Sequence, residues 1–181
     1  APDRETVRGT IGYLLEDAYT MLTGDSDPAR RAQFRPLFLE VAKERQRRET
    51  VLFPGAEELL RALHGHGVKT AIVSTKRGDT IQYIMERYHL LDQLEFVIGS
   101  EDVHAPKPDP QGLNMALERM GLKPEELLFC GDTVLDAGAA KNAGCPFCAV
   151  LNGTTPAGDF ADFHPVHIAP DLFELRQWLE G

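Results

Sequence analysis

The chain has 181 residues, of which 43% are hydrophobic and 26% are charged, and its formal net charge at pH 7 is -9. These values are typical of a globular protein that can bury a core, and the negative charge argues against broad binding to nucleic acids or anionic membranes. No apolar run reaches the ~18 residues of a membrane span, and residues 1–4 are polar. We therefore expect neither a transmembrane segment nor a signal peptide, and a cytoplasmic location.

The N-terminal part of the chain is predicted to be helical. Apolar residues recur at helical spacing from Val7 to Leu22, and residues 23–28, which include Gly24 and Pro28, break that pattern. A second helix is predicted from about Ala29 to Arg48. No strand is expected before residue 50.

From Phe53 onward the sequence alternates between helix and strand patterns. Helices are predicted at 56–64, 79–88, 110–120, 136–142 and 172–179, and strands at 69–74, 96–99, 127–130 and 147–151, with a weaker strand at 166–168. Repeated strand–helix units predict an α/β fold with a mostly parallel sheet and flanking helices. Right-handed crossovers then place the loops that follow the strands at one edge.

Polar side chains follow two predicted strands in a way that suits an anion. The strand at 69–74 ends in Ser74 and Thr75, and the following helix could offer backbone N–H groups to the same anion. Hydroxyls in this position are also common as simple helix caps. Further along, Lys107 stands between two prolines that stiffen its loop and would hold the ammonium in place.

The segment Gly131–Asp136 carries the strongest chemical signal in the chain. An apolar strand leads into Asp132, and the next helix brings Asp136 back to the same strand end. Mg²⁺ is usually held by one or two carboxylates together with waters and substrate phosphate oxygens. Ligands of open α/β sheets bind beyond the carboxyl ends of the strands. The pattern predicts a Mg²⁺ site at Asp132 and Asp136.

In this order and spacing, Ser74 after a strand, Lys107 in Lys-Pro-Asp-Pro and the Gly-Asp-x-x-x-Asp segment resemble the haloacid dehalogenase-like hydrolases. Within that superfamily the chain is most similar to phosphatases of the phosphoglycolate phosphatase type. The resemblance implies a Rossmann-like core at 51–181 and part of a helical cap at 1–50. It also implies a Mg²⁺-dependent phosphatase of small phosphorylated metabolites that works through an aspartyl-phosphate.

The resemblance implies a role for each of these side chains. Ser74, with Thr75 as a further donor, would hydrogen-bond the transferring phosphoryl group, and Lys107 would neutralise that group and the nucleophile. Asp132 would bind Mg²⁺ directly, and Asp136 directly or through a water. These residue types suit phosphoryl transfer, which depends mainly on positioning and on charge stabilisation.

The nucleophile that the resemblance implies is absent from this sequence. It would be an Asp of an Asp-x-Asp pair after a first, central strand, whereas Asp25-Ser26-Asp27 lies between two predicted helices and is interpreted as a turn and helix cap. Without that strand, the strands that end at Ser74 and Asp132 would keep unpaired edges. We therefore expect the chain alone to be inactive, and the position to be filled by a missing N-terminal segment, a retained peptide or a swapped strand.

Other functions remain open. A phosphomutase of the same fold would keep the phosphoryl group, and a non-catalytic protein would bind phosphate or a partner without turnover. Dehalogenase chemistry is disfavoured, because it is independent of metal and has no use for the two clustered acids Asp132 and Asp136.

The three cysteines predict no disulfide framework. Cys145 and Cys148 have the spacing of a redox pair, but they lead into the apolar run 148–151 and are interpreted as small buried residues. Arg77 could meet an anionic group of a substrate, although a role on the helix surface is favoured.

Overall fold

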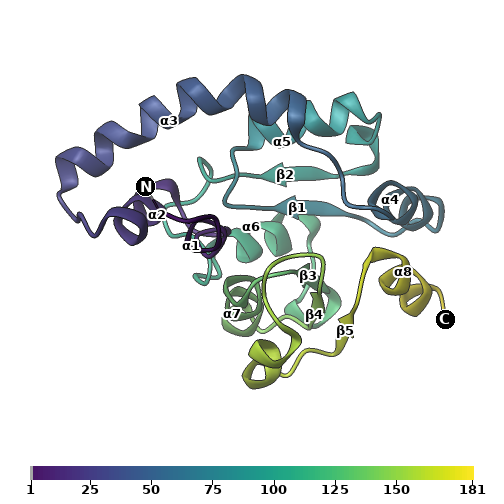
Figure 1. Cartoon of the computed structure of the whole chain (residues 1–181). Helices are drawn as coiled ribbons and strands as arrows, with labels where there is room; N and C mark the ends of the chain where they lie inside the picture. Colours follow the sequence, from purple (N-terminus) through teal and green to yellow (C-terminus); the bar gives the residue numbers. More distant parts are fainter. Residues whose placement is uncertain (1) are drawn as a thin grey trace. The chain divides into compact units, whose positions relative to one another are not determined.

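The computed structural model describes residues 2–181, apart from the side chains of residues 43 and 44. The chain forms two compact units, one that ends at Thr50 and one that covers Val51–Gly181 (Figure 1). In the part of the chain that is described, no helix has both the length and the apolar character needed to cross a membrane.

The N-terminal unit is helical, with α1 at Arg4–Arg8, α2 at Leu15–Thr23 and α3 at Pro28–Glu49. The predicted continuous helix through Val7 and Leu22 is wrong, because Gly9 ends α1 and Gly12 adopts a positive φ of 98°. Helices α2 and α3 pack through Tyr19 and Phe34, whose ring centroids are 5.1 Å apart. The Asp-x-Asp segment forms a turn here, in which the Asp27 side chain caps α3 by accepting a hydrogen bond from the Arg30 N–H.

The C-terminal unit alternates between helices and short strands, as the sequence predicts. Its helices are α4 (Ala56–Gly65), α5 (Gly78–Arg87), α6 (Gln111–Met120), α7 (Val134–Ala143) and α8 (Leu172–Glu180), and its strands are β1 (Ala71–Val73), β2 (Phe96–Ile98), β3 (Phe129–Gly131), β4 (Phe147–Val150) and β5 (His167–Ala169). Three short 3₁₀ helices lie at Leu91–Gln93 (η1), Pro124–Glu126 (η2) and Ala157–Phe163 (η3).

All strand pairs are parallel, which confirms the predicted α/β fold class, but the strands form two separate sheets. One sheet pairs β1 with β2, and the other has the order β3-β4-β5. Among the described residues, one edge of β1 and one edge of β3 therefore have no strand partner. This division lies where the family resemblance places a central strand.

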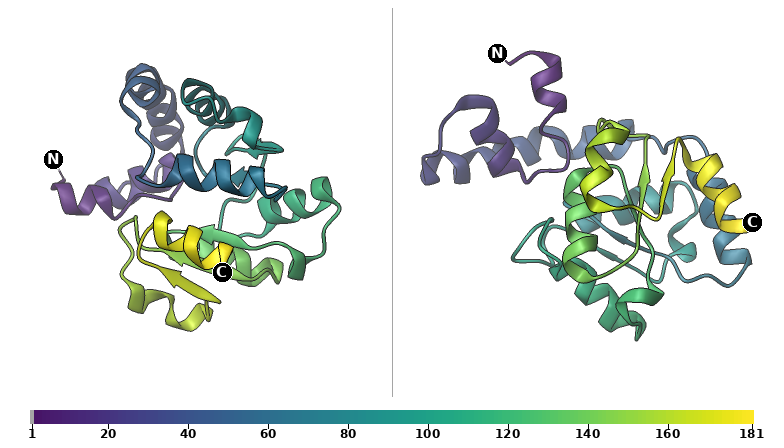
Figure 2. Two further views of the ribbon diagram at one scale, coloured as in Figure 1. Left: turned by 90° about the vertical axis from the view of Figure 1, so that its right-hand side faces the viewer. Right: turned by 90° about the horizontal axis from the view of Figure 1, so that it is seen from below.

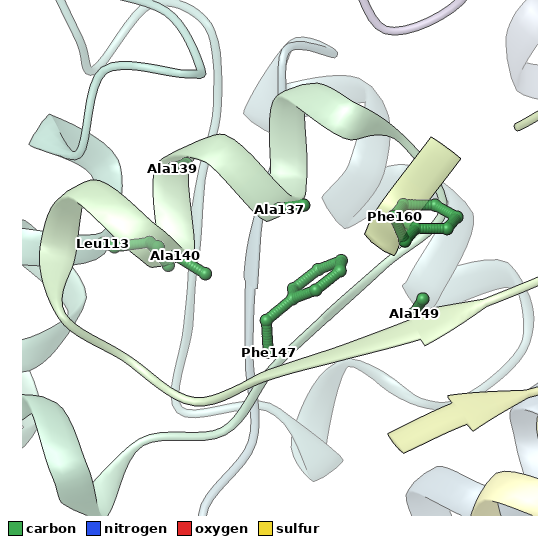
Figure 3. Close-up of a cluster of buried hydrophobic side chains, with 7 residues drawn as sticks. All are labelled: Leu113, Ala137, Ala139, Ala140, Phe147, Ala149 and Phe160. Atoms are coloured by element: carbon green, nitrogen blue, oxygen red, sulfur yellow. The ribbon is translucent and has the colours of Figure 1, made fainter. Parts of the chain in front are cut away.

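Helices cover both faces of the two sheets. Figures 1 and 2 show α7 and α8 on opposite sides of β4 and β5. On the α7 side, Phe147 of β4 points toward α7 and packs with Phe160, their ring centroids being 5.9 Å apart (Figure 3). On the other side, Cys148 packs with side chains of α4 and α8.

The same helices join the two sheets. Val73 of β1 packs against the α7-side cluster, which also contains Leu113 of α6. On the other face, α4 places Leu59 against β4 and Leu60 against the cluster formed by α5 and β2. Side-chain packing therefore links the sheets where backbone hydrogen bonds do not.

Burial differs across the strands. Every residue of β4 is buried, whereas all of β1 is only half-buried and Cys130 of β3 is exposed. In a sheet covered on both faces, inner strands are normally the most buried. The order agrees with the topology, because β4 is the inner strand of its sheet and β1 and β3 lie at sheet edges.

The segment between β4 and β5, for which the sequence pattern predicts no helix or strand before residue 166, contains η3. Phe160 within it is fully buried. Trp178 of α8 is 39% exposed and stacks on His167 with a centroid distance of 4.5 Å.

Candidate functional site

The turn from β3 into α7 is built around a capping box. Thr133 is the N-cap of α7, and its Oγ1 accepts a hydrogen bond from the Asp136 N–H at 3.2 Å. In return, Oδ2 of Asp136 accepts hydrogen bonds from the Thr133 N–H at 3.0 Å and from its hydroxyl at 2.7 Å. Gly131 makes room for this arrangement, because a Cβ there would lie 2.4 Å from the Cβ of Asp136. The strand end and the helix start are thus locked together.

Lys107 reaches this turn from the loop before α6. Its Nζ donates to Oδ1 of Asp136, and the side chains of the pair are only 14% and 6% exposed. The ammonium also lies 5.7 Å from the centroid of the Phe129 ring. Both carboxylate oxygens of Asp136 therefore already have partners within the chain.

Two residues of α7 hold the Lys107 loop in place. The Asn142 side-chain amide donates to the carbonyl of Pro108 at 2.9 Å. At Gly138, one helical turn earlier, a Cβ would lie 2.8 Å from the Cβ of Pro108. Sequence reasoning missed both residues. The only sequence signal for this contact was Gly138 inside a predicted helix, with Asn142 four positions later.

Asp132 is the carboxylate of this corner that remains available. It is half-buried, and across the described residues no other group donates a hydrogen bond to its side chain. Burial, followed by the negative charge of Asp136, raises the pKa of Asp132 above its ordinary value. Gly153, in the loop after β4, packs directly on it, because a Cβ there would lie 2.1 Å from Oδ2.

These features suit a cation at Asp132. A half-buried carboxylate whose pKa is raised by burial and by a second acid is stabilised by a nearby positive charge. The donors are hard oxygens, as Mg²⁺ requires. Asp132 would be the direct ligand, and Asp136, whose Oδ1 accepts one hydrogen bond, could reach the ion directly or through a water. Within the described part of the chain, no three His, Cys, Asp or Glu side chains gather into a metal-binding group.

The second part of the predicted site is the loop between β1 and α5. The Ser74 N–H donates to the carbonyl of Ile98 at 3.0 Å, which continues the pairing of β1 with β2. The Ser74 hydroxyl oxygen accepts a hydrogen bond from the Lys76 N–H at 3.1 Å. Thr75 is half-buried in the same loop. Ser74 and Thr75 follow β1 of one sheet and Asp132 follows β3 of the other.

The first turn of α5 is already capped. The Gly78 N–H donates to the carboxylate of Glu101, at 3.0 Å to Oε1 and 3.1 Å to Oε2. Gly99 allows this approach, because a Cβ there would lie 2.2 Å from the Gly78 nitrogen. The expectation that the helix start offers its backbone N–H groups to an anion therefore does not hold at Gly78.

The cations of this loop differ in their surroundings. Arg77 pairs with Asp79, with two contacts of 3.1 Å, and lies 3.9 Å from Glu101, so its charge is neutralised within the chain. Burial lowers the pKa of Lys76, and no acidic side chain pairs with it among the described residues. Lys76, which sequence reasoning did not select, is therefore the better candidate to meet a ligand anion.

Comparisons with known proteins all point to the same family. The family model described as haloacid dehalogenase-like hydrolase matches residues 1–150. A phosphoglycolate phosphatase of Vibrio vulnificus is 30% identical over 165 residues, which is 91% of this chain and 72% of that protein. A phosphoglycolate phosphatase of Salmonella typhimurium is 37% identical over 151 residues, which is 83% of this chain but only 58% of that protein.

Solved structures agree with these matches. A haloacid dehalogenase-like protein from Bacteroides fragilis is 34% identical, with a TM-score of 0.94 over 97% of this chain and 83% of that one. A haloacid dehalogenase-like family protein from Streptococcus pneumoniae shares the fold, with a TM-score of 0.87 at 24% identity over 99% of this chain and 82% of that one.

Proposed function

The chain belongs to the haloacid dehalogenase-like hydrolases, and we propose that it forms the metal- and phosphate-binding part of a Mg²⁺-dependent phosphatase of small phosphorylated metabolites. The observation that carries this proposal is the corner after β3. There, an unpartnered Asp132 carboxylate lies beside a buried Lys107–Asp136 ion pair. The relatives named phosphoglycolate phosphatase support the same class of substrate.

Each residue of the corner has a distinct part in this proposal. Asp132 holds Mg²⁺, which when bound offsets negative charge on the phosphoryl group and on the attacking carboxylate. Asp136 holds the Lys107 ammonium through Oδ1 and the α7 cap through Oδ2. Lys107 is thereby fixed in a position from which it can neutralise a phosphate oxygen. We assign Asp136 to the positioning of Lys107, with contact to the metal only through a water.

The loop after β1 supplies neutral donors and one cation. The Ser74 hydroxyl accepts a single hydrogen bond, so its proton is free to donate to a phosphate oxygen. Thr75 offers a second hydroxyl nearby. A substrate that carries a carboxylate beside its phosphate, as phosphoglycolate does, would give Lys76 an acceptor.

The open edges of β1 and β3 are the basis for a proposal about the nucleophile. We propose that a further strand pairs with both edges and carries the Asp that the family resemblance implies. A strand there would bury β1 and Cys130, which are under-buried at present. Residues 1–50 would act as part of a helical cap and residues 51–181 as the catalytic core, and the chain without the added strand would not turn over substrate.

Phosphate release tests this function. The chain is compared with a version that is extended at its N-terminus by a strand-forming segment with an Asp at its end. Phosphoglycolate and a chromogenic aryl phosphate serve as substrates, with and without Mg²⁺. We expect Mg²⁺-dependent release from the extended chain only. Asp132→Asn in the extended chain should abolish it, while Asp159→Asn, at an exposed carboxylate, should not.

Three outcomes would redirect the proposal. Turnover without Mg²⁺ would contradict the role of Asp132. Isomerisation of a sugar phosphate without phosphate release would indicate a phosphomutase, and phosphate binding without turnover would indicate a binding protein. Lys76→Met should raise KM for phosphoglycolate more than for the aryl phosphate, which lacks a carboxylate, and equal changes would exclude Lys76 from substrate selection.

A further inference from the structure

The loop that carries Lys107 is closed by a side chain of the helix that follows it. Gln111, at the start of α6, accepts hydrogen bonds through Oε1 from two successive backbone N–H groups, those of His104 at 2.8 Å and Ala105 at 2.9 Å. The Asp109 side chain in turn accepts a hydrogen bond from the Gln111 N–H at 2.9 Å. The beginning of the loop is therefore tied to the helix at its end.

The tip of the same loop is tied to α7. The Asn142 side-chain amide donates to the carbonyl of Pro108 at 2.9 Å. Gly138 is buried, and a Cβ there would lie 2.8 Å from the Cβ of Pro108. Asp136, which accepts a hydrogen bond from the Lys107 Nζ, belongs to α7 as well. One helix therefore holds both the backbone beside Lys107 and the end of its side chain.

The length of a lysine side chain makes such support of the backbone necessary. Four rotatable bonds lie between the Lys107 ammonium and its backbone, so a lysine on a loose loop samples many positions. The ammonium stays at one point only if its backbone is fixed and its Nζ has a fixed partner. Asp136 is the partner, and the contacts of the loop with α6 and α7 fix the backbone.

We propose that Gln111 and Asn142, together called the Lys107 clamp, are positioning residues for the Lys107 ammonium. Gln111 fixes the backbone before Lys107, and Asn142 fixes the backbone after it. Both act through the loop, and they keep the ammonium on Asp136 and within reach of a phosphate oxygen. The benefit to phosphoryl transfer rests on the proposed function, whereas the effect on Lys107 itself does not.

Amine labelling of the folded chain tests the clamp without any need for catalysis. An acylating reagent is applied in short pulses, and the modified lysines are located by peptide mapping, with the exposed Lys69 as the reference. An ammonium that is shielded in an ion pair reacts slowly, so the labelling rate of Lys107 reports opening of its loop.

Removal of either half of the clamp should make Lys107 more reactive. Gln111→Met and Asn142→Ala should each raise the labelling rate of Lys107, relative to that of Lys69, by about 3-fold or more, the factor by which the loss of one hydrogen bond shifts an equilibrium. Asn142→Ala also places the better helix former in α7, so the helix itself should not be weakened. An unchanged Lys107 rate in both variants would overturn the proposal.

Matched variants separate positioning from a general loss of structure. Gln111→Glu keeps an oxygen acceptor for both N–H groups and should label at the original rate. Asn114→Ala makes the same substitution at an exposed position of α6, where the side chain has no hydrogen-bond partner among the described residues, and should leave Lys107 unchanged. An equal acceleration at the half-buried Lys76 would show that the whole unit has loosened, and would contradict the proposal.

Turnover by the extended chain connects the clamp with the proposed function. Asn142→Ala should lower kcat/KM for the aryl phosphate about 10-fold, mostly through kcat, because a displaced charged group no longer meets the transition state. Gln111→Glu should retain the original rate. Faster labelling of Lys107 with unchanged turnover would overturn the positioning role. Absence of phosphate release from the unmutated extended chain would contradict the proposed function instead, and the labelling rates would still decide whether the clamp holds Lys107.

Discussion

The corner after β3 and the loop after β1 both stand at strand ends of the same unit, but they use their polar groups differently. At the β3 corner, Asp136 satisfies both carboxylate oxygens within the chain through Lys107 and Thr133. In the β1 loop, the Ser74 hydroxyl accepts one hydrogen bond and Lys76 pairs with no acid among the described side chains. Apart from Asp132, the first region satisfies its polar side chains within the chain, whereas the second leaves its side chains available to a ligand.

This difference separates stability from function. Changes to Lys107, Thr133 or Asp136 at the β3 corner should lower the free energy of unfolding, because they leave a buried charge or a helix cap without its partner. Changes in the β1 loop should leave the fold intact and act on ligands alone. Four predictions test this contrast.

Lys107→Met should have the largest effect on stability. It leaves the Asp136 carboxylate, whose side chain is 6% exposed, without its cation. Removal of one partner of a buried ion pair typically costs about 3–5 kcal/mol, and the remaining bonds to Thr133 favour the lower value of about 3 kcal/mol. Urea unfolding measures it. Arg176→Met, at the exposed pair with Glu180, should cost less than about 0.5 kcal/mol and serves as the control. Equal losses of unfolding free energy in the two variants would show that the buried pair at the β3 corner stabilises the fold no more than an exposed pair does.

Gly153→Ala should displace Asp132. The new Cβ would lie 2.1 Å from Oδ2, so the carboxylate must rotate or the loop must move. Loss of a group that orients a metal ligand typically weakens metal affinity about 10–100-fold, and calorimetric titration with Mg²⁺ measures this. Gly158→Ala, where nothing lies within 4 Å, is the control. Identical affinities for the two variants would exclude Asp132 as the ligand.

Removal of the hydroxyl from each region compares them directly. Thr133→Ala loses both hydrogen bonds of its Oγ1 with Asp136 and should cost about 1–2 kcal/mol, the range of a lost N-cap. Ser74→Ala loses one hydrogen bond at a half-buried position and should change stability by less than about 0.5 kcal/mol. Thermal unfolding of both variants checks this order, and a reversed order would refute the contrast.

Asp132→Asn should have the smallest effect, and of opposite sign. Because the pKa of Asp132 is raised in the folded state, the folded protein holds its proton more tightly than the unfolded chain does. Without metal, the wild-type stability therefore falls as pH rises through that pKa. Asn carries no charge, so the variant should be the more stable of the two near pH 7. Urea titrations at several pH values should show this gain shrinking toward about pH 4, the ordinary range of Asp. A gain that does not depend on pH would point to packing instead.

The sequence was sufficient for the order of elements in the C-terminal unit. Its strands are short apolar runs, and they alternate with longer segments that carry the helical pattern. It failed near Gly9 and Gly12, since apolar spacing survives across a turn that glycine conformation creates. It also failed at η3, where Phe160 anchors a segment whose composition indicated a loop.

The candidate site was only partly predictable for a related reason. Asp132 and Asp136 are close in sequence, so helix geometry alone brings them together. The supports of the site are contacts over long sequence separations, such as Asn142 with Pro108 and Gly153 with Asp132. Local patterns contain no information on such pairs.

The carboxylate of Glu101 at the start of α5 makes this helix a shared element. The cap comes from the loop after β2, and the Ser100 N–H of that loop donates to the carbonyl of Lys76 at 3.1 Å. Residues 74–87 and 99–101 therefore form one transferable module. A chimaera that exchanges only the first segment with a relative would leave Gly78 uncapped, whereas exchange of both would carry the loop geometry intact.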